Sequence, residues 1–225
     1  MDIQKDTPVG RIAAEHPAAT RVLHRFGIDY CCAGGKSIEV ACDARDIDID
    51  VVLAEVREEL RQPQKDETHW NSADLNSLID HILVAYHKPL QEELPRLEAM
   101  TTKVAAVHRE KDARLTELRS VFAALKTELD AHMMKEEQIL FPMIRRGQGG
   151  SAAGPISVMK HEHDSAGAAL RRMRDLTDDF QPPEAACNTW RATLHGLEQM
   201  ERELHEHIHL ENNILFPRAL GNDAG

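Results

Sequence analysis

Apolar residues recur at intervals of three and four along most of this chain, which is the spacing of one face of an α-helix. Such stripes predict four long helices over residues 73–108, 112–144, about 155–180 and about 183–216. Pro89 and Pro95 lie inside the first of these and should bend or split it. The alternation typical of β-strands is not sustained anywhere. Four helices with short connections predict an all-α four-helix bundle.

The first sixty residues have the pattern of a separate, small helical domain. One helix is predicted over residues 8–26, and Gly27 should end it. A glycine-rich turn with adjacent cysteines follows, and then two helices that Ser37 and Asp48 should cap. Polar residues and a proline replace the pattern over 61–72, which predicts a linker between domains at 1–60 and 73–225.

Charge and composition exclude several classes of partner and location. The net charge of −11 argues against nucleic acid and anionic membranes as partners. No run approaches the ~20 apolar residues of a membrane helix. The first residues lack an apolar run behind a basic start, so we expect no signal peptide. The four cysteines do not resemble a disulfide framework, so we expect a cytoplasmic protein. The chain has 13 His although only 4% of its residues are aromatic, and this imbalance points to a metal.

Two segments of the predicted bundle repeat one pattern of residues. In both copies a Glu follows a His by four positions, and a Phe-Pro pair follows after that. The copies are His132, Glu136, Phe141 and Pro142 in one half, and His207, Glu211, Phe216 and Pro217 in the other. His87 precedes His132 by 45 residues, and His163 precedes His207 by 44. The bundle therefore consists of two similar halves.

This spacing has a direct chemical meaning. Residues four apart on a helix lie on the same face, so each His–Glu pair can point into the bundle. With His87 and His163 the set becomes four imidazoles and two carboxylates that can bridge two ions. Mixed ligation with open positions suits iron, manganese less well, and structural zinc poorly. Glu128, Glu162 and Glu203 are candidate hydrogen-bond acceptors behind the ligands, although Glu128 and Glu203 are equally compatible with a solvated face.

A zinc-protease pattern overlaps the last helix. Residues 205–209 match H-E-x-x-H, with His205 and His209 as its ligands. Their face is turned by about 200° from that of His207 and Glu211, and only one of the two faces should be buried. The repeat selects His207 and Glu211. We therefore expect His161 and His205 to be exposed and the protease match to be accidental.

At this point the residues resemble a known family. The six ligands resemble those of hemerythrin-like domains, and the runs YCC, HMMKEEQILFPMI, GPISVMKHEHD and LENNILFPRAL look like the repair-of-iron-centres proteins. The resemblance implies two iron ions in an oxo- or hydroxo-bridged centre, and repair of iron–sulfur clusters damaged by nitrosative or oxidative stress, through iron donation. Its alternative is nitric oxide binding, scavenging or reduction at that centre. Damaged iron–sulfur proteins and nitric oxide are the implied partners, and a homodimer is compatible with the family.

The adjacent Cys31 and Cys32 have two interpretations. A disulfide between neighbours is strained, and the nearby glycines permit close backbone approach. The thiols either capture iron, nitric oxide or a client cluster, or they are inert in a buried turn. Cys187 is expected to be structural. Together these features favour a non-enzymatic repair protein, with nitric oxide reduction as the enzymatic alternative.

Overall fold

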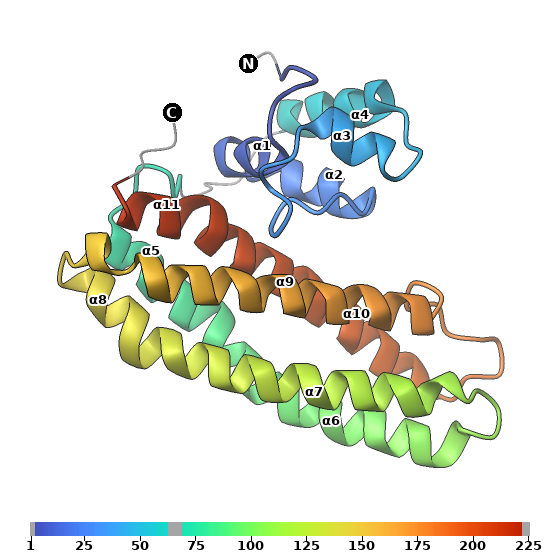
Figure 1. Cartoon of the computed structure of the whole chain (residues 1–225). Coiled ribbons are helices and arrows are strands. Elements are labelled where there is room, and N and C mark those ends of the chain that lie inside the picture. Colours follow the sequence, from blue (N-terminus) through green and yellow to red (C-terminus); the bar gives the residue numbers. More distant parts are fainter. Residues whose placement is uncertain (1–2, 63–68, 222–225) are drawn as a thin grey trace. The chain divides into compact units, whose positions relative to one another are not determined.

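The computed structural model describes residues 3–62 and 69–221, and every regular element within these ranges is a helix (Figure 1). The all-α fold predicted from the pattern is therefore confirmed. Contacts divide the chain into two compact units. The N-terminal unit comprises residues up to Asp80, Gly149–Ser151 and the chain from His205 onward, and the bundle unit comprises His81–Gln148 and Ala152–Leu204. The predicted linker at 61–72 falls partly on 63–68, outside the described residues.

Four short helices open the N-terminal unit. They are α1 Val9–Glu15, α2 Ala19–Arg25, α3 Ile38–Asp43 and α4 Ile49–Arg61. The two predicted caps are confirmed, because the side chain of Ser37 accepts from the Val40 amide and that of Asp48 from the Asp50 amide.

The single helix predicted over 8–26 is wrong, because the structure divides it into α1 and α2. His16 ends α1 with φ −134° and ψ 79°. Pro17 follows, and a proline forces the residue before it out of the helical region. The apolar spacing continues across this break because Ile12, Ala13, Val22 and Leu23 are all buried in the same core.

The other end of the chain belongs to this same unit. Beyond His205 the helix α10 ends at Leu210, and η4 Glu211–Leu215 and α11 Phe216–Ala219 follow. Arg218 donates hydrogen bonds of 2.7 Å to the backbone carbonyls of Trp70 and Ala73, just before α5 Leu75–Ile82. The N-terminal segment and the last helical turns thus share one packed unit.

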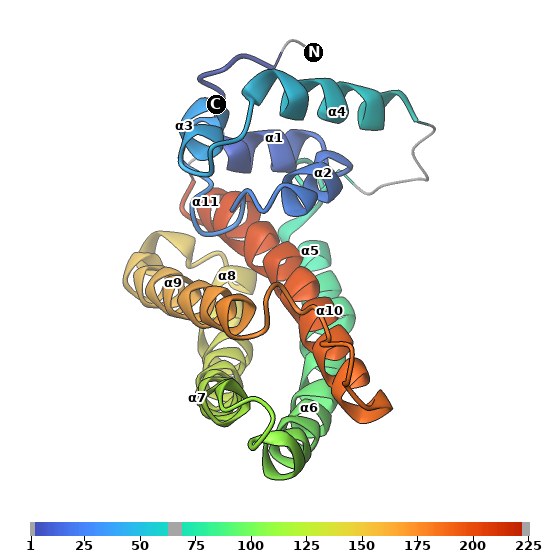
Figure 2. The ribbon, with the colours of Figure 1, turned by 90° about the vertical axis from the view of Figure 1, so that its right-hand side faces the viewer.

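The bundle unit contains four long helical segments. They are α6 Lys88–His108, α7 Arg114–Lys135, α9 Ala153–Leu176 and α10 from Asn188 as far as Leu204, with the short α8 Phe141–Arg145 after α7. Figure 2 shows the four as separate helices, with α6 and α7 viewed nearly end-on. Their interior is apolar, with Leu94, Phe122, Met173 and Leu197 at 0% exposed. Within the described ranges, no helix is both long and apolar enough to span a bilayer.

Prolines change the type of helix in three places. Five-residue π-helical segments are η1 Leu83–His87, η2 Glu136–Leu140 and η4, and Pro89, Pro142 and Pro217 follow them by two residues each. Because proline has no N–H, a carbonyl in the preceding turn loses its helical partner, and the turn widens. Pro89 therefore changes the helix without ending it, and Pro95 lies inside α6. Each π-helical segment begins or ends at a predicted metal ligand.

Candidate metal centre

Four of the six predicted ligands gather inside the bundle unit. Glu136, at the start of η2, is 0% exposed. The Nε2 atoms of His87 and His132 lie 3.4 Å and 3.3 Å from the same Glu136 oxygen. His163, from α9, brings its Nε2 atom to 3.1 Å from that of His132. Three helical segments thus direct imidazole nitrogens toward one buried carboxylate.

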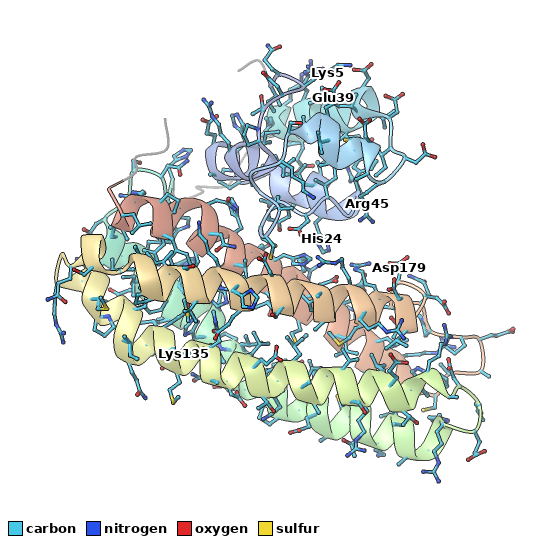
Figure 3. The ribbon with its side chains drawn as sticks, viewed as in Figure 1. Lys5, His24, Glu39, Arg45, Lys135 and Asp179 are labelled. Carbon is cyan, nitrogen blue, oxygen red and sulfur yellow. The ribbon has the colours of Figure 1, made fainter. Side chains whose placement is uncertain are left out.

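In two of these imidazole rings, the nitrogen that faces away from Glu136 is within hydrogen-bond distance of another carboxylate. His87 Nδ1 lies 2.9 Å from Glu137 Oε1, and His132 Nδ1 lies 2.8 Å from Glu162 Oε2. Lys135, labelled in Figure 3, forms an ion pair with Glu162. Such partners fix the tautomer of an imidazole and leave its other nitrogen lone pair for a metal. Glu137 was not anticipated from the sequence.

The remaining candidate acceptors do not approach the cluster in this way. Glu128 is exposed on α7, and Glu203 accepts a 2.9 Å hydrogen bond from Gln199.

Glu162 is ionised in its contact with His132. Burial alone would raise the pKa of Glu162, but hydrogen bonds from Lys135 and His132 outweigh it and lower that pKa. Glu162 is therefore a carboxylate that can hold the proton on His132 Nδ1.

The donor set of the bundle unit fits a metal ion. The ligand atoms of His132, Glu136 and His163 all lie within 4.8 Å of one another, and all three side chains are buried. A buried carboxylate needs compensating positive charge. The Nε2 atoms of His132 and His163 face each other at 3.1 Å and can supply lone pairs to a cation, and the same cation would compensate the charge of the carboxylate. Imidazole with carboxylate suits a divalent transition metal.

The other two predicted ligands belong to the N-terminal unit. His207 lies in the last turn of α10, and its Nε2 atom is 3.0 Å from Glu211 Oε1 at the start of η4. His207 is 2% exposed and Glu211 is 0% exposed. The four-residue spacing therefore brings an imidazole and a carboxylate together, as it does for His132 and Glu136.

The opposite face of this helix is also buried, contrary to prediction. His209 is 4% exposed, and its Nδ1 atom is 2.9 Å from Asn213 Nδ2, while Asn213 also donates to the Tyr30 carbonyl at 3.0 Å. Burial lowers the pKa of His209 to about 4. His205 is half-buried rather than exposed, because its ring packs edge-on against those of His24 and Tyr30. The N-terminal segment covers this face, and sequence periodicity alone does not reveal which faces will be covered.

The adjacent cysteines lie in this covering segment. Both are free thiols. Cys31 Sγ lies 3.6 Å from Cys32 Sγ and 3.3 Å from Asp29 Oδ1. Asn212, directly after Glu211, donates to the Cys31 carbonyl at 3.2 Å. The Cys32 thiol, burial and the Asp29 carboxylate hold the pKa of Cys31 well above its usual value. A protonated Cys31 favours the inert interpretation for that thiol, and the role of the pair stays a prediction.

Comparisons with known proteins agree with these features. Residues 78–219 match the hemerythrin HHE cation binding domain, and residues 5–60 match a domain of unknown function, DUF542. The iron–sulfur cluster repair protein YtfE of Escherichia coli O81 is 44% identical over 219 residues, which are 97% of this chain and 99% of that protein. The YtfE protein of Escherichia fergusonii has the same identity and coverage. The chain belongs to the iron–sulfur cluster repair family. The predicted hemerythrin-like bundle with a small helical domain before it is confirmed.

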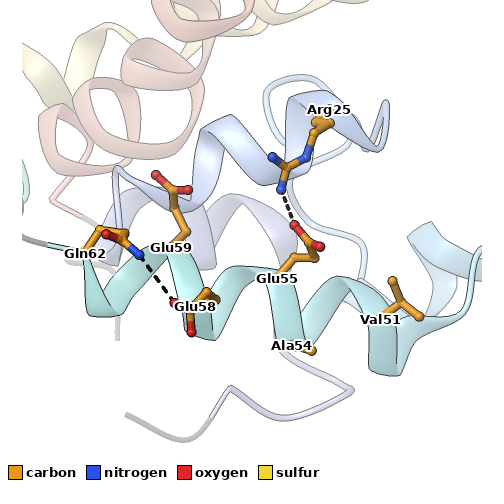
Figure 4. A pocket seen from close by; sticks show the side chains of 7 residues that line it. All are labelled: Arg25, Val51, Ala54, Glu55, Glu58, Glu59 and Gln62. Atoms are coloured by element: carbon orange, nitrogen blue, oxygen red, sulfur yellow. Dashed lines mark hydrogen bonds and ion pairs between the residues drawn. The ribbon is translucent and has the colours of Figure 1, made fainter.

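One surface pocket of this family member is lined by none of the predicted ligands. It has a volume of about 450 Å³ and lies along α4, beside the end of α2 (Figure 4). Arg25 forms an ion pair with Glu55, and Gln62 donates to Glu58 at 3.3 Å. Its charged side chains are thus largely engaged with each other, and we assign it no ligand.

Proposed function

We propose that this chain repairs damaged iron–sulfur clusters, and that it does so by donating iron from a di-iron centre. The proposed ligands are the six buried residues His87, His132, Glu136, His163, His207 and Glu211. His132 and His163 would hold one ion, His87 and His207 would hold the other, and Glu136 and Glu211 would supply carboxylate ligands to both. The observation that carries the proposal is the cluster in the bundle unit, where imidazoles from three helical segments converge on the buried Glu136.

The placement of His207 and Glu211 in this centre rests on the helix that bears them. His207 follows Met200 by seven residues, and Glu211 follows Leu204 by seven, which is about two turns. Met200 and Leu204 are buried residues of the bundle unit, so the same face of α10 leads on to the two ligands. The repeat with His132 and Glu136 supports this, and so does the family match, which spans both halves.

Only four protein ligands hold each ion in this arrangement. Bound iron would therefore keep coordination positions open to an outside ligand. The protein's own contribution is to orient the ligands: Glu137 and Glu162 accept the Nδ1 protons of His87 and His132, so both rings present Nε2 to the ion. The low coordination by protein makes one ion transferable, and that ion is the cargo given to a damaged cluster.

We place this activity in the cytoplasm, because four free thiols suit a reducing compartment. Damaged iron–sulfur proteins are the proposed partners, as the names of the relatives indicate. Nitric oxide is the proposed small ligand, and a homodimer stays a prediction.

The test is reactivation of an iron–sulfur dehydratase whose cluster has been damaged with nitric oxide. The iron-loaded chain should restore activity while losing iron, whereas Glu211→Ala should restore little. Glu128→Ala, which changes an exposed carboxylate one turn before a ligand, is the matched control and should act as the wild type does. Reactivation by the metal-free chain would contradict iron donation. Consumption of nitric oxide without reactivation would favour the scavenging alternative.

A further inference from the structure

We propose that Cys187 is a reactive thiol, activated by His108, that forms mixed disulfides with low-molecular-weight disulfides. The two side chains come from different helices of the bundle unit. His108 ends α6, and Cys187 directly precedes α10. His108 Nε2 lies 3.2 Å from Cys187 Sγ, which is within hydrogen-bond distance for sulfur.

The histidine is fixed and is directed at the sulfur. His108 is only 8% exposed, and its ring stacks on Trp190 with the centroids 5.1 Å apart and the planes at 27°. Within the described part of the chain its Nδ1 atom is buried and has no hydrogen-bond partner. Among residues 3–62 and 69–221, the contact with Cys187 is therefore the one polar interaction of this ring. A buried imidazole in this position can exchange a proton with the thiol.

Cys187 lies at the start of a long helix. The Arg191 amide donates to the Cys187 carbonyl at 3.0 Å, which makes Cys187 the N-cap residue of the 23-residue α10. The first backbone N–H groups of a helix have no partner within the helix, and they are directed toward a residue at this position. The Arg191 side chain donates to the carbonyls of Glu184 and Ala186, which fixes the segment before the cap. Cys187 was expected to lie inside a helix that starts near residue 183, so the sequence concealed this arrangement.

The thiol is accessible, whereas its base is not. Cys187 is exposed, while Cys31 and Cys42 are buried. A pocket of about 220 Å³ shares Pro183 and Trp190 with this region, four residues before and three residues after Cys187. Neither Cys187 nor His108 lines this pocket. The exposed thiol is itself open to a low-molecular-weight disulfide, which is the reactant we expect.

The reaction balances without further reagents. The Cys187 proton passes to His108 Nε2 while the sulfur attacks one sulfur of the disulfide R–S–S–R. A new Cys187–S–S–R bond forms, the old S–S bond breaks, and the leaving thiolate takes the proton from His108 to give R–SH. Cys187 is oxidised, and half of the reagent is reduced. His108 lies 21 residues after His87, about 30 Å along the helix, so this site is distinct from the metal cluster.

The experiment is peptide mapping by mass spectrometry during reaction of the full chain with oxidised glutathione. Cys187 should gain one glutathionyl group at least about tenfold faster than the same thiol in a peptide of residues 183–191. His108→Gln should reduce the rate to that of the peptide. The matched control is His195→Gln, which changes an exposed histidine on the same helix and should leave the rate unchanged.

Two outcomes would overturn the proposal. One is a wild-type rate no greater than that of the peptide, which needs no variant to fold. The other is a folded His108→Gln chain, with unchanged circular dichroism, that reacts as fast as the wild type. Cys187→Ser should abolish the modification on the 183–191 fragment, which assigns the mass gain to this thiol.

Discussion

A methyl group added at Gly34 should disrupt the packing between η4 and the segment that carries Cys31 and Cys32. A Cβ atom at this position would lie 2.5 Å from Asn213 Oδ1 and 3.0 Å from the Tyr30 carbonyl oxygen. Both separations are shorter than ordinary carbon–oxygen contacts. A shift of the Asn213 side chain would break its contacts, because it donates to the Tyr30 carbonyl and lies 2.9 Å from His209 Nδ1. The Gly34→Ala substitution must therefore break these interactions or displace backbone.

The magnitude follows from these contacts. Two hydrogen bonds contribute about 1 kcal/mol each, and overpacking in a rigid site costs about 1–3 kcal/mol when neither side can yield. If Asn213 moves away, the overpacking is relieved but the two hydrogen bonds are lost, so the two costs do not add in full. We therefore expect a loss of about 2–3 kcal/mol in the free energy of unfolding. For a chain of this size that is about 4–12 °C in Tm.

Gly35 offers a matched control one residue away. A Cβ atom there meets nothing within 4 Å, and neither glycine has a positive φ, so backbone strain affects neither substitution. Gly35→Ala should leave stability unchanged or raise it slightly. The assay is urea unfolding of the metal-free variants, followed by circular dichroism. Equal midpoints for Gly34→Ala and Gly35→Ala would refute the packing described for η4.

Three further substitutions test the ligand cluster and the cysteine turn. Glu136→Ala should lower the iron content per chain far more than Glu128→Ala, and equal iron in both variants would remove the bridging role. Glu162→Ala frees the Nδ1 atom of His132 and should weaken iron binding about 10–100-fold in a chelator competition; an unchanged affinity would contradict this orienting role. Burial would raise the pKa of Asp29, but backbone hydrogen bonds from Cys32 and Ala33 outweigh it and lower the pKa below 3.8, so its stabilisation is present above that pH and lost as pH falls through the lowered value. Asp29→Asn should cost about 1–2 kcal/mol near pH 7 and little in strong acid, as urea unfolding at both pH values would show; an equal cost at both would contradict it.

The long helices and the candidate ligands are predictable because their signals are local. Apolar residues at intervals of three and four mark each helix, and Ser37 and Asp48 mark two helix starts by their own side chains. His132 and Glu136 share a face because of the α-helical period alone. The repeat then identifies the second His–Glu pair, without any knowledge of how the helices pack.

The features that the sequence did not predict depend on contacts between segments that are far apart in the chain. His209 is buried because residues near Tyr30 cover it, and nothing in the helix that bears it predicts that cover. The spacing from His132 selects Glu136 as a ligand, but nothing in the sequence indicates that its neighbour Glu137 accepts from His87, because that contact depends on the approach of another helix. Pro17 is the exception: its effect on His16 is local, and the continuous apolar spacing across it concealed the break.

The most direct test of the di-iron proposal is the iron content per chain, measured with an absorption spectrum. It compares the wild type with a double variant, His207→Ala with Glu211→Ala. We expect about two irons per wild-type chain, with near-ultraviolet bands of a bridged centre, and loss of both iron and bands in the variant. An iron content and spectrum that this double substitution leaves unchanged would contradict the account, because the two halves of the repeat would then not form one centre.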